Sequence, residues 1–317
     1  MKTKLWTALI ALYIVWGSTY LAIRFAVETM PPFLHASLRF LVSGLILFIW
    51  RRAAGDPKPT VGNWKSTAIV GTFLLLGGNG LVALAEKHIP SGIAALVIST
   101  SPFWLVLFES LRAGGTKPNW QSILGLVIGF SGVFYLIGPA EITGSGQQFN
   151  TFSLILLLCA PVLWSLGSIY ARGAEMPQST LMSTGMQMLA GAVSLFIVSA
   201  MSGELSSFNL AQVTLRSWLG LAYLITFGSL VGFVAYGWLL HNAPVSLFST
   251  YAYVNPVVAV FLGWWLANEE LNIRMVVASA IIIGSVIFIN YARQLQSKRR
   301  KPEQSQFGKN QIATNSD

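Results

Sequence analysis

Charged and titratable residues inside otherwise apolar stretches are the chain's first candidates for chemistry. Arg39 lies in the apolar run 32–50, seven residues after Pro32, roughly 10 Å along a helix rising ~1.5 Å per residue. A charge at that depth in a bilayer costs about 2.5–3.5 kcal/mol on insertion scales, so it usually faces a partner or a cavity. Arg39 could therefore bind an anionic group such as a carboxylate, or pair with Glu86. The alternative is a structural side chain that extends to the interface.

Three further titratable side chains are candidates for proton coupling or gating. His35 lies one turn before Arg39 and could titrate near neutral pH. Glu109 lies deep in its apolar run, seven residues after Pro102, and Glu86 lies near the outer end of the preceding span, directly after the run 67–85. Each has a plainer alternative: an interfacial histidine, an anchor at the inner interface and a solvated loop residue, respectively.

Aromatic and small polar side chains near the middle of apolar runs are candidates for substrate binding. Aromatic walls with a few polar groups suit small organic ligands. The same residue types also pack helices together and bond them within a membrane, which is the alternative for each one. With Arg39, the candidates are Trp16, Ser18, Thr19, Asn79, Trp104, Trp164, Tyr253 and Asn255.

Two apolar stretches carry prolines at the same spacing, IPSGIAALVISTSP ending at Pro102 and APVSLFSTYAYVNP ending at Pro256. Each of these prolines lies about 17 Å into its run, near the midplane of a bilayer. A proline there kinks a helix and frees the carbonyl four residues earlier, on Ile98 and on Ala252. Paired broken helices at matching positions point to a binding cavity and its gating, whereas bends needed only for packing are the alternative.

The elements that must position these residues are membrane-spanning helices. Of 317 residues, 54% are hydrophobic and 10% charged, and mean hydropathy is +0.63, whereas a soluble domain has about 25% charged residues. The sequence therefore predicts an all-α integral membrane protein, since a span needs ~20 apolar residues. Ten runs qualify: 5–23, 32–50, 67–85, 91–111, 120–138, 152–171, 179–201, 217–240, 245–268 and 275–292. The first is predicted to be a retained helix, not a signal peptide.

Lysine and arginine residues set the predicted orientation. With the N-terminus inside, the inner segments hold 15 basic residues and the outer loops hold 4. Both termini are therefore predicted to be cytoplasmic. The net charge of +9 reflects this topology and a basic tail, residues 293–317, predicted to be disordered; it does not indicate nucleic-acid binding.

The two halves of the chain share sparse identities in one order, which indicates an internal duplication. Five spans in each half would place the second half in the membrane from the opposite side, so the repeat is predicted to be inverted, as in many transporters. At a shift of 154 residues, Thr72-Phe73 matches Thr226-Phe227, Gly78 matches Gly232 and Pro102 matches Pro256; separately, Trp16 to Arg24 resembles Trp164 to Arg172.

Three segments, WGSTYLAIRFAVETMPPFLHASLRFLVSGLIL, GGNGLVALAEKHIPSGIAALV and STYAYVNPVVAVFLGWWLANEEL, resemble the EamA family of the drug/metabolite transporter superfamily, in particular its YedA-type members. The resemblance covers about residues 10–290. It implies two five-helix EamA repeats, at 1–138 and 152–292, and export of small metabolites or toxic compounds across a bacterial inner membrane. The halves differ after the shared proline, because the second half has Glu269-Glu270 where the first has Gly115-Thr116.

The sequence favours a secondary transporter over its rivals. It lacks the HExxH zinc motif, the GxSxG elbow and a phosphate loop, and the three scattered histidines do not suggest a metal site, so no cofactor, metal or catalytic residue is expected. A channel or facilitator for small solutes, and a membrane-embedded enzyme or scaffold, stay as alternatives. The expected partners are a small-molecule substrate, membrane lipid and candidate coupling protons, with the protein a monomer or homodimer.

Overall fold

The computed structural model describes residues 2–112, 117–138, 150–243 and 250–292, and all regular structure in those ranges is helical. The predicted basic tail lies outside the described residues. In chain order the elements are α1 (Lys2–Ala26), α2 (Pro32–Ala53), α3 (Val61–Gly71), η1 (Thr72–Gly80), α4 (Leu81–Ala85), α5 (Ser91–Ile98), α6 (Ser101–Leu111), α7 (Trp120–Ile137), α9 (Thr151–Ala171), α10 (Thr180–Met201), α11 (Glu204–Ser207), η2 (Leu210–Gln212), α12 (Leu215–Tyr223), η3 (Leu224–Val231), α13 (Gly232–Asn242), α15 (Tyr251–Ala267) and a last helix, Ile273–Ala292.

Nine helices in the described ranges are long and apolar enough to cross a membrane. One of them, Val61–Ala85, runs through α3, η1 and α4, and another, Ser91–Leu111, runs through α5 and α6. The predicted run 245–268 appears as α15, a shorter apolar helix that follows the undescribed residues 244–249. The prediction of an all-helical, multi-pass membrane protein is therefore confirmed, and a tenth span stays a prediction.

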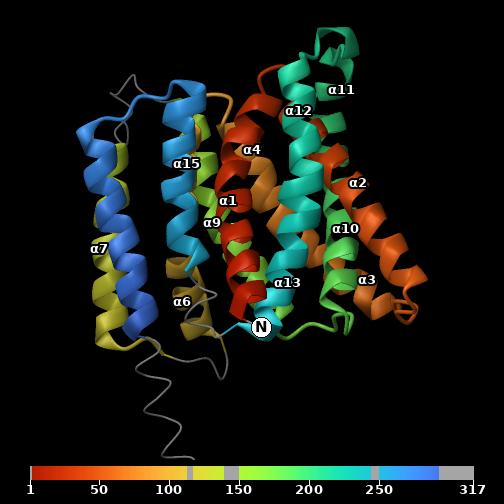
Figure 1. The fold of residues 1–317 in the computed structure, drawn as a ribbon, viewed down its shortest axis with the longest axis horizontal. Coiled ribbons are helices and arrows are strands. Elements are labelled where there is room, and N and C mark those ends of the chain that lie inside the picture. The colour runs from red at the N-terminus through yellow and green to blue at the C-terminus, as the bar shows by residue number, and fades with distance from the viewer. Residues whose placement is uncertain (1, 113–116, 139–149, 244–249, 293–317) are drawn as a thin grey trace, which may run out of the picture.

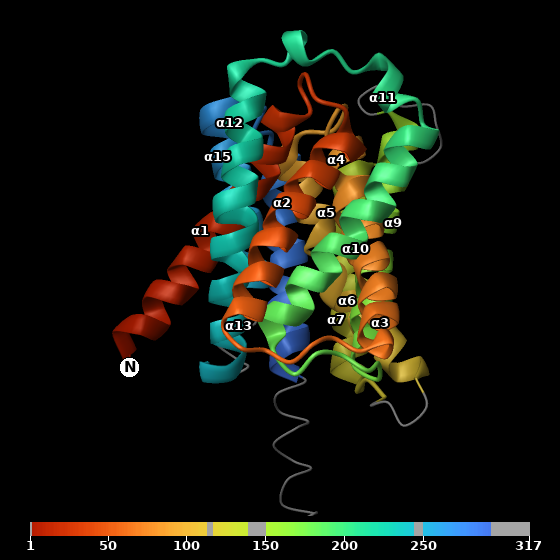
Figure 2. The ribbon, with the colours of Figure 1, turned by 90° about the vertical axis from the view of Figure 1, so that its right-hand side faces the viewer.

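The helices stand side by side in one bundle, shown from two directions in Figures 1 and 2. α2 packs along α10, α1 packs against α15, α12 and α13, and α9 packs against η1, α4 and α6. At the left-hand side of the bundle in Figure 1, α7 lies beside the last helix. Their close approach needs glycine: a Cβ atom on Gly132 would come within 2.8 Å of Ile281. Figure 2 shows the N-terminal part of α1 sloping away from the other helices.

The spans that begin at α3 and α12 are built in the same way. Each starts at an N-cap threonine, Thr60 or Thr214, whose side-chain oxygen accepts a backbone N–H of the first turn. Each then passes from α-helix into a π-helical segment, η1 or η3. The two caps are 154 residues apart, which is the shift of the sequence repeat. π-helical turns are wider than α-helical ones and are frequent at functional sites. The segments η1 and η3 therefore indicate a candidate functional site in the middle of the bundle.

The span that begins at α5 is broken near its middle, immediately before Pro102. α5 ends at Ile98, α6 starts at Ser101, and the proline lies in the first turn of α6, where its missing N–H removes no bond. The sequence predicted that the Ile98 carbonyl is free of a hydrogen bond. That prediction was wrong, because the Ser101 hydroxyl donates to this carbonyl at 2.6 Å. Ser99 and Thr100 bond their own i−3 carbonyls in the same way. In contrast, α15 continues through Pro256.

Candidate functional site

Trp16 anchors an aromatic cluster between α1 and the second half of the chain. Its rings lie 5.3 Å from Phe233, 5.2 Å from Tyr236 and 5.5 Å from Tyr251, between centroids. Its indole Nε1 donates to the Gly228 carbonyl at 3.2 Å, within η3. The indole also lies against Gly232, where a Cβ atom would overlap it. The side chain is only partly buried, and its contacts place the aromatic cluster beside η3 and the start of α13.

Trp164 makes the corresponding contact from the other half. It lies on α9, and a Cβ atom on Gly78 of η1 would come within 2.8 Å of its Cε3 atom. Next to it, the Ser165 hydroxyl donates to the Ser101 carbonyl at 3.0 Å, which ties α9 to the break before Pro102. The two tryptophans and the two glycines that the repeat pairs in sequence therefore pack in reciprocal pairs, each across the two halves.

Arg39 is a buried cation without a carboxylate partner. Its side chain is 4% exposed, and its Nε donates to the Ser229 hydroxyl at 3.0 Å. No ion pair to Arg39 is found among the described residues. The Gly228 position separates it from Thr19, since a Cβ atom there would lie 3.3 Å from Arg39 Nη2 and 3.0 Å from Thr19 Cγ2. Arg39, Thr19 and Trp16 therefore meet at the Gly228–Ser229 part of η3.

The other predicted polar and aromatic residues do not gather at one place. Ser18 hydrogen-bonds the hydroxyl of Tyr223, the residue directly before η3, at 2.6 Å. Asn79 donates to the Leu74 carbonyl within η1, one residue from Gly78. Trp104 and Tyr253 pack instead in the region of α6, α7 and the last helix, where Trp104 lies 5.3 Å from Phe130. Asn255 is buried, with its side-chain oxygen unpaired.

The three candidates for proton coupling or gating differ sharply in their surroundings. His35 is 1% exposed, and its Nδ1 has no hydrogen-bond partner. Glu109 forms an ion pair with Arg172 at 2.8 Å, between the end of α6 and the end of α9. Glu86 is fully buried, and neither carboxyl oxygen has a hydrogen-bond partner among the described residues. Glu109 is therefore a paired charge, whereas one ring nitrogen of His35 and both carboxyl oxygens of Glu86 are unpaired in the described part of the structure.

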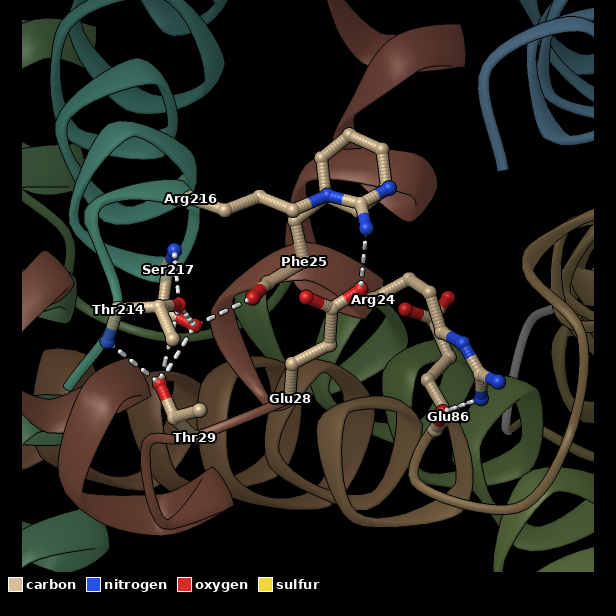
Figure 3. Close-up of polar contacts among 8 residues, drawn as sticks. All are labelled: Arg24, Phe25, Glu28, Thr29, Glu86, Thr214, Arg216 and Ser217. Atoms are coloured by element: carbon tan, nitrogen blue, oxygen red, sulfur yellow. Dashed lines mark hydrogen bonds and ion pairs between the residues drawn. The ribbon is translucent and has the colours of Figure 1, made fainter. Parts of the chain in front are cut away.

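At the end of the bundle where α1 terminates, here called the distal end, α1 is tied to the start of α12 (Figure 3). Glu28 pairs with Arg216 at 3.2 Å, and the Arg216 guanidinium lies 3.8 Å from the centre of the Phe25 ring. The Thr29 hydroxyl donates to Ser217 at 2.8 Å, and Ser217 donates to the Phe25 carbonyl at 2.7 Å. These contacts join the first helix of one half to the third span of the other.

At the opposite, proximal end, the same kind of contact joins α9 to α3. Glu175, in the loop after α9, accepts from the Thr60 hydroxyl at 2.7 Å, and Asn63 donates to the Glu175 carbonyl at 3.3 Å. Thr60 and Asn63 are the positions that match Thr214 and Ser217 at the shift of 154. These contacts were not predicted from the sequence, although the N-cap threonines at matching positions of the two halves were a signal for them.

Two acidic residues close the distal end further by capping helices of the first half. Glu269 accepts from the Ser91 and Gly92 N–H groups at 2.7 and 3.0 Å, at the start of α5. Glu204 accepts from the Leu34 N–H at 2.9 Å, at the start of α2. A carboxylate at a helix N-terminus satisfies unpaired N–H groups and favours the helix dipole. Glu269 therefore has a structural partner, and Glu204 has a role that its sequence context did not reveal.

An apolar groove of about 480 Å³ lies between α1, α2, η3 and α13. Ile46, Leu47 and Trp50 form one side, and Leu230 and Val231, which directly follow Ser229, form part of the other. Its lining holds no charged residue, so the groove suits lipid or an apolar substituent of a ligand.

A bundle of apolar helices in which two halves of the chain meet at the middle and are tied at the ends is an architecture that recurs among membrane transporters. The chain belongs to the EamA-like transporter family, which matches residues 4–138 and again residues 151–291. The two matches confirm the internal repeat and the family that the sequence motifs indicated. Family membership also favours transport over catalysis as the activity.

Curated relatives carry transporter names as well. The chain is 36% identical over 292 residues to YedA of Escherichia coli strain K12, an uncharacterized inner membrane transporter, covering 92% of each chain. It is 24% identical over 291 residues to YoaV of Bacillus subtilis strain 168, an uncharacterized transporter, covering 90% of this chain and 96% of that one. A crystal structure of another protein, 20% identical, superposes with a TM-score of 0.61 over 91% of this chain and 97% of that chain, which shows the fold alone.

Proposed function

We propose that the chain is a secondary transporter that exports small metabolites or drugs, including amino-acid-like compounds, by alternating access. Two inverted repeats of five helices, ten spans in all, would move against each other around a site at the midplane. The observation that carries this proposal is the reciprocal packing of Trp16 on Gly232 and Trp164 on Gly78. A pseudo-two-fold arrangement of two halves accounts for both contacts at once.

The proposed substrate site is centred on Arg39 and η3. A buried guanidinium that has no carboxylate partner among the described residues suits a substrate that carries a carboxylate, since arginine binds carboxylates in a two-pronged geometry. Trp16 and Thr19 reach the same part of η3 and would contact the rest of the substrate. The remaining proposed lining residues are Ser18, Asn79, Trp104, Trp164, Tyr253 and Asn255.

The contacts at the two ends are the proposed gates. In alternating access, one end opens while the other is closed, so Glu28–Arg216 at the distal end and Glu175–Thr60 at the proximal end would break in turn. The ion pair between Glu109 and Arg172 would belong to the proximal gate. Two hinges are proposed. One lies at the break before Pro102, where the backbone departs from a regular helix, and the other lies at Pro256, where a continuous helix lacks one backbone N–H donor.

The proposed location is the bacterial inner membrane, the place that the name of the relative YedA gives for that protein. The excess of Lys and Arg in the segments on the side of the N-terminus supports cytoplasmic termini, so the distal end would face outward. The protein would act as a monomer or homodimer.

Metabolite profiling tests the export proposal directly. The protein and an Arg39→Ala variant are expressed at matched abundance in a bacterial strain without its own copy, and the medium is analysed by mass spectrometry. One compound class should accumulate outside with the wild type and less with the variant. Export would be contradicted if the medium held the same metabolites at the same levels for cells that contain folded, inserted protein and for cells that lack the protein. A channel or facilitator predicts flux that does not saturate with substrate concentration.

A further inference from the structure

We propose that Glu86 is a proton-binding carboxyl that holds a proton while the distal end is closed and releases it when that end opens. This inference rests on the proposed function, because it assigns a coupling ion to the same transport cycle. The carboxyl lies at the end of α4, directly after the span Val61–Ala85, so it is placed where a span meets the distal loops.

The burial of Glu86 argues that its carboxyl is neutral in this conformation. The residue is 0% exposed, and both carboxyl oxygens lack a hydrogen-bond partner within the described part of the chain. A carboxylate removed from water without partners is so unfavourable that the group takes up a proton instead. Burial, together with the negative charge of Glu269 nearby, raises the pKa of Glu86 well above its ordinary value, whereas Arg24 opposes this shift.

The geometry of Arg24 agrees with a neutral acid. Its guanidinium donates to the main-chain carbonyl of Glu86 and not to the carboxyl of the same residue, as Figure 3 shows. An ionised Glu86 would offer a stronger acceptor to that guanidinium than a neutral carbonyl does. Arg24 is only partly buried, so it can serve as the counter-ion once water reaches the site.

The other charged and titratable groups around Glu86 come from α1, from α2 and from the loops after α4 and α15. α1 supplies Arg24 and Tyr20, whose phenol interacts electrostatically with the Glu86 carboxyl. The loop after α15 supplies Glu269, whose oxygens bond the start of α5. Lys87 and His88 follow in the chain and are exposed. On α2, which also packs against α4, Arg39 is bonded to Ser229 and His35 has an unpaired Nδ1.

Proton release by Glu86 is coupled to opening of the distal end because α1 contacts both Glu86 and the start of α12. The last turns of α1 carry Arg24, which contacts Glu86, and are followed by Glu28 and Thr29, which contact the start of α12 (Figure 3). Movement of α1 away from α12 would also admit water to Glu86. The carboxylic acid would then give its proton to that water and leave a carboxylate beside Arg24. Opening of the distal end and loss of one proton are thus a single event.

Two measurements on the full-length protein in lipid nanodiscs test this without a substrate. Infrared difference spectra of the wild type, of Glu86→Gln and of the exposed-residue control Glu270→Gln show whether a protonated carboxyl is present at neutral pH. Hydrogen exchange of residues 24–30 and 214–217, corrected for its intrinsic pH dependence, reports opening of the distal end. A single linked proton makes the opening equilibrium change up to about tenfold per pH unit.

The proposal expects a C=O band of a protonated acid in the wild type and in Glu270→Gln, and its loss in Glu86→Gln. Protection of the distal segments should fall as the pH rises in the wild type and stay constant in Glu86→Gln. Arg24→Gln should move the transition to higher pH, because a cation that favours the ionised form is removed. A band unchanged in Glu86→Gln, or protection independent of pH in the wild type, overturns the proposal. Both effects without any export would refute the proposed function and leave the proton site standing.

Discussion

Trp164 packs so closely on Gly78 that a Cβ atom on the glycine would come within 2.8 Å of indole atom Cε3. Trp16 packs on Gly232 in the same manner, and the two glycines are 154 residues apart. In each pair the tryptophan lies on the first helix of one half and the glycine lies in or directly after the π-helical segment of the other half. The proposed transport cycle requires the two halves to slide or tilt against each other at these two tryptophan–glycine contacts.

Replacing either glycine with alanine should therefore disturb the protein at both sites in the same way. Gly78→Ala and Gly232→Ala should each lower the free energy of unfolding by about 1–3 kcal/mol, the usual range for overpacking, and should reduce export. Gly284→Ala is the matched control, because nothing lies within 4 Å of a Cβ atom at that helical position. Thermal unfolding in detergent checks the prediction, and a loss of stability as large in the control as in the two variants would refute it.

Arg39→Met should separate stability from function. Arg39 is a buried cation with no carboxylate partner in the ranges that the structure describes. Its removal relieves an unfavourable desolvation, so the melting temperature should rise or stay unchanged while export falls. Arg112→Met, at an exposed position, is the control and should change neither quantity. Melting curves and export assays on the same preparations check this. A variant that both melts earlier and exports normally would show that Arg39 is structural.

Ser101→Ala should destabilise the broken span more than loss of a surface hydroxyl does. The Ser101 hydroxyl is a donor to the Ile98 carbonyl, which the break leaves without a helical partner. An unsatisfied carbonyl costs about 1–3 kcal/mol when buried, and this part-buried one should cost an amount near the lower end of that range. Ser110→Ala, whose hydroxyl bonds the Leu107 carbonyl in a regular and exposed turn, should cost less. Equal unfolding midpoints for the two variants would contradict a role for Ser101 at the break.

Ionised Asp56 should contribute to the stability of the protein at its proximal end, and acid should remove this contribution. Hydrogen bonds from Arg51 and from the N-cap residue Ser179 of α10 lower the pKa of Asp56 below its ordinary value, while partial burial opposes them. Its contribution to stability is therefore present above the ordinary pKa of aspartate and is lost as the pH falls through the lowered pKa. Unfolding midpoints measured between neutral and acidic pH should fall less for Asp56→Asn than for the wild type. Identical slopes would exclude this contribution.

The sequence predicted the membrane class and the repeat because both depend on patterns along the chain. Run lengths, the positions of Lys and Arg, and the shift of 154 residues need no tertiary information. The pairing of Trp16 with Gly232 was not predictable in the same way. It depends on which face each helix turns to the other half, and the tryptophans obey a shift of 148 while the glycines obey one of 154.

Glu86 and Glu269 show why the candidate site was harder to predict than the fold. Glu86 stands beside Lys87 at the end of an apolar run, which is the usual context of a solvated residue, yet it is completely buried in the folded chain. Glu269 has no sequence signal for the start of α5, 178 residues away, which it caps. Both roles arise from how helix ends meet at the distal end, and a single sequence does not encode that meeting in any local pattern.

Reversible cross-linking of each end tests alternating access most directly. In a Cys159→Ser background, one cysteine pair replaces Thr29 and Thr214, whose hydroxyl oxygens lie 3.5 Å apart at the distal end. A second pair replaces Thr60 and Glu175, which are hydrogen-bonded at the proximal end. A short bifunctional thiol reagent with a cleavable link is then applied to each pair, and export is followed before and after cleavage. Alternating access predicts that locking either end stops export and that cleavage restores it. Export that continues with one end locked would contradict the account.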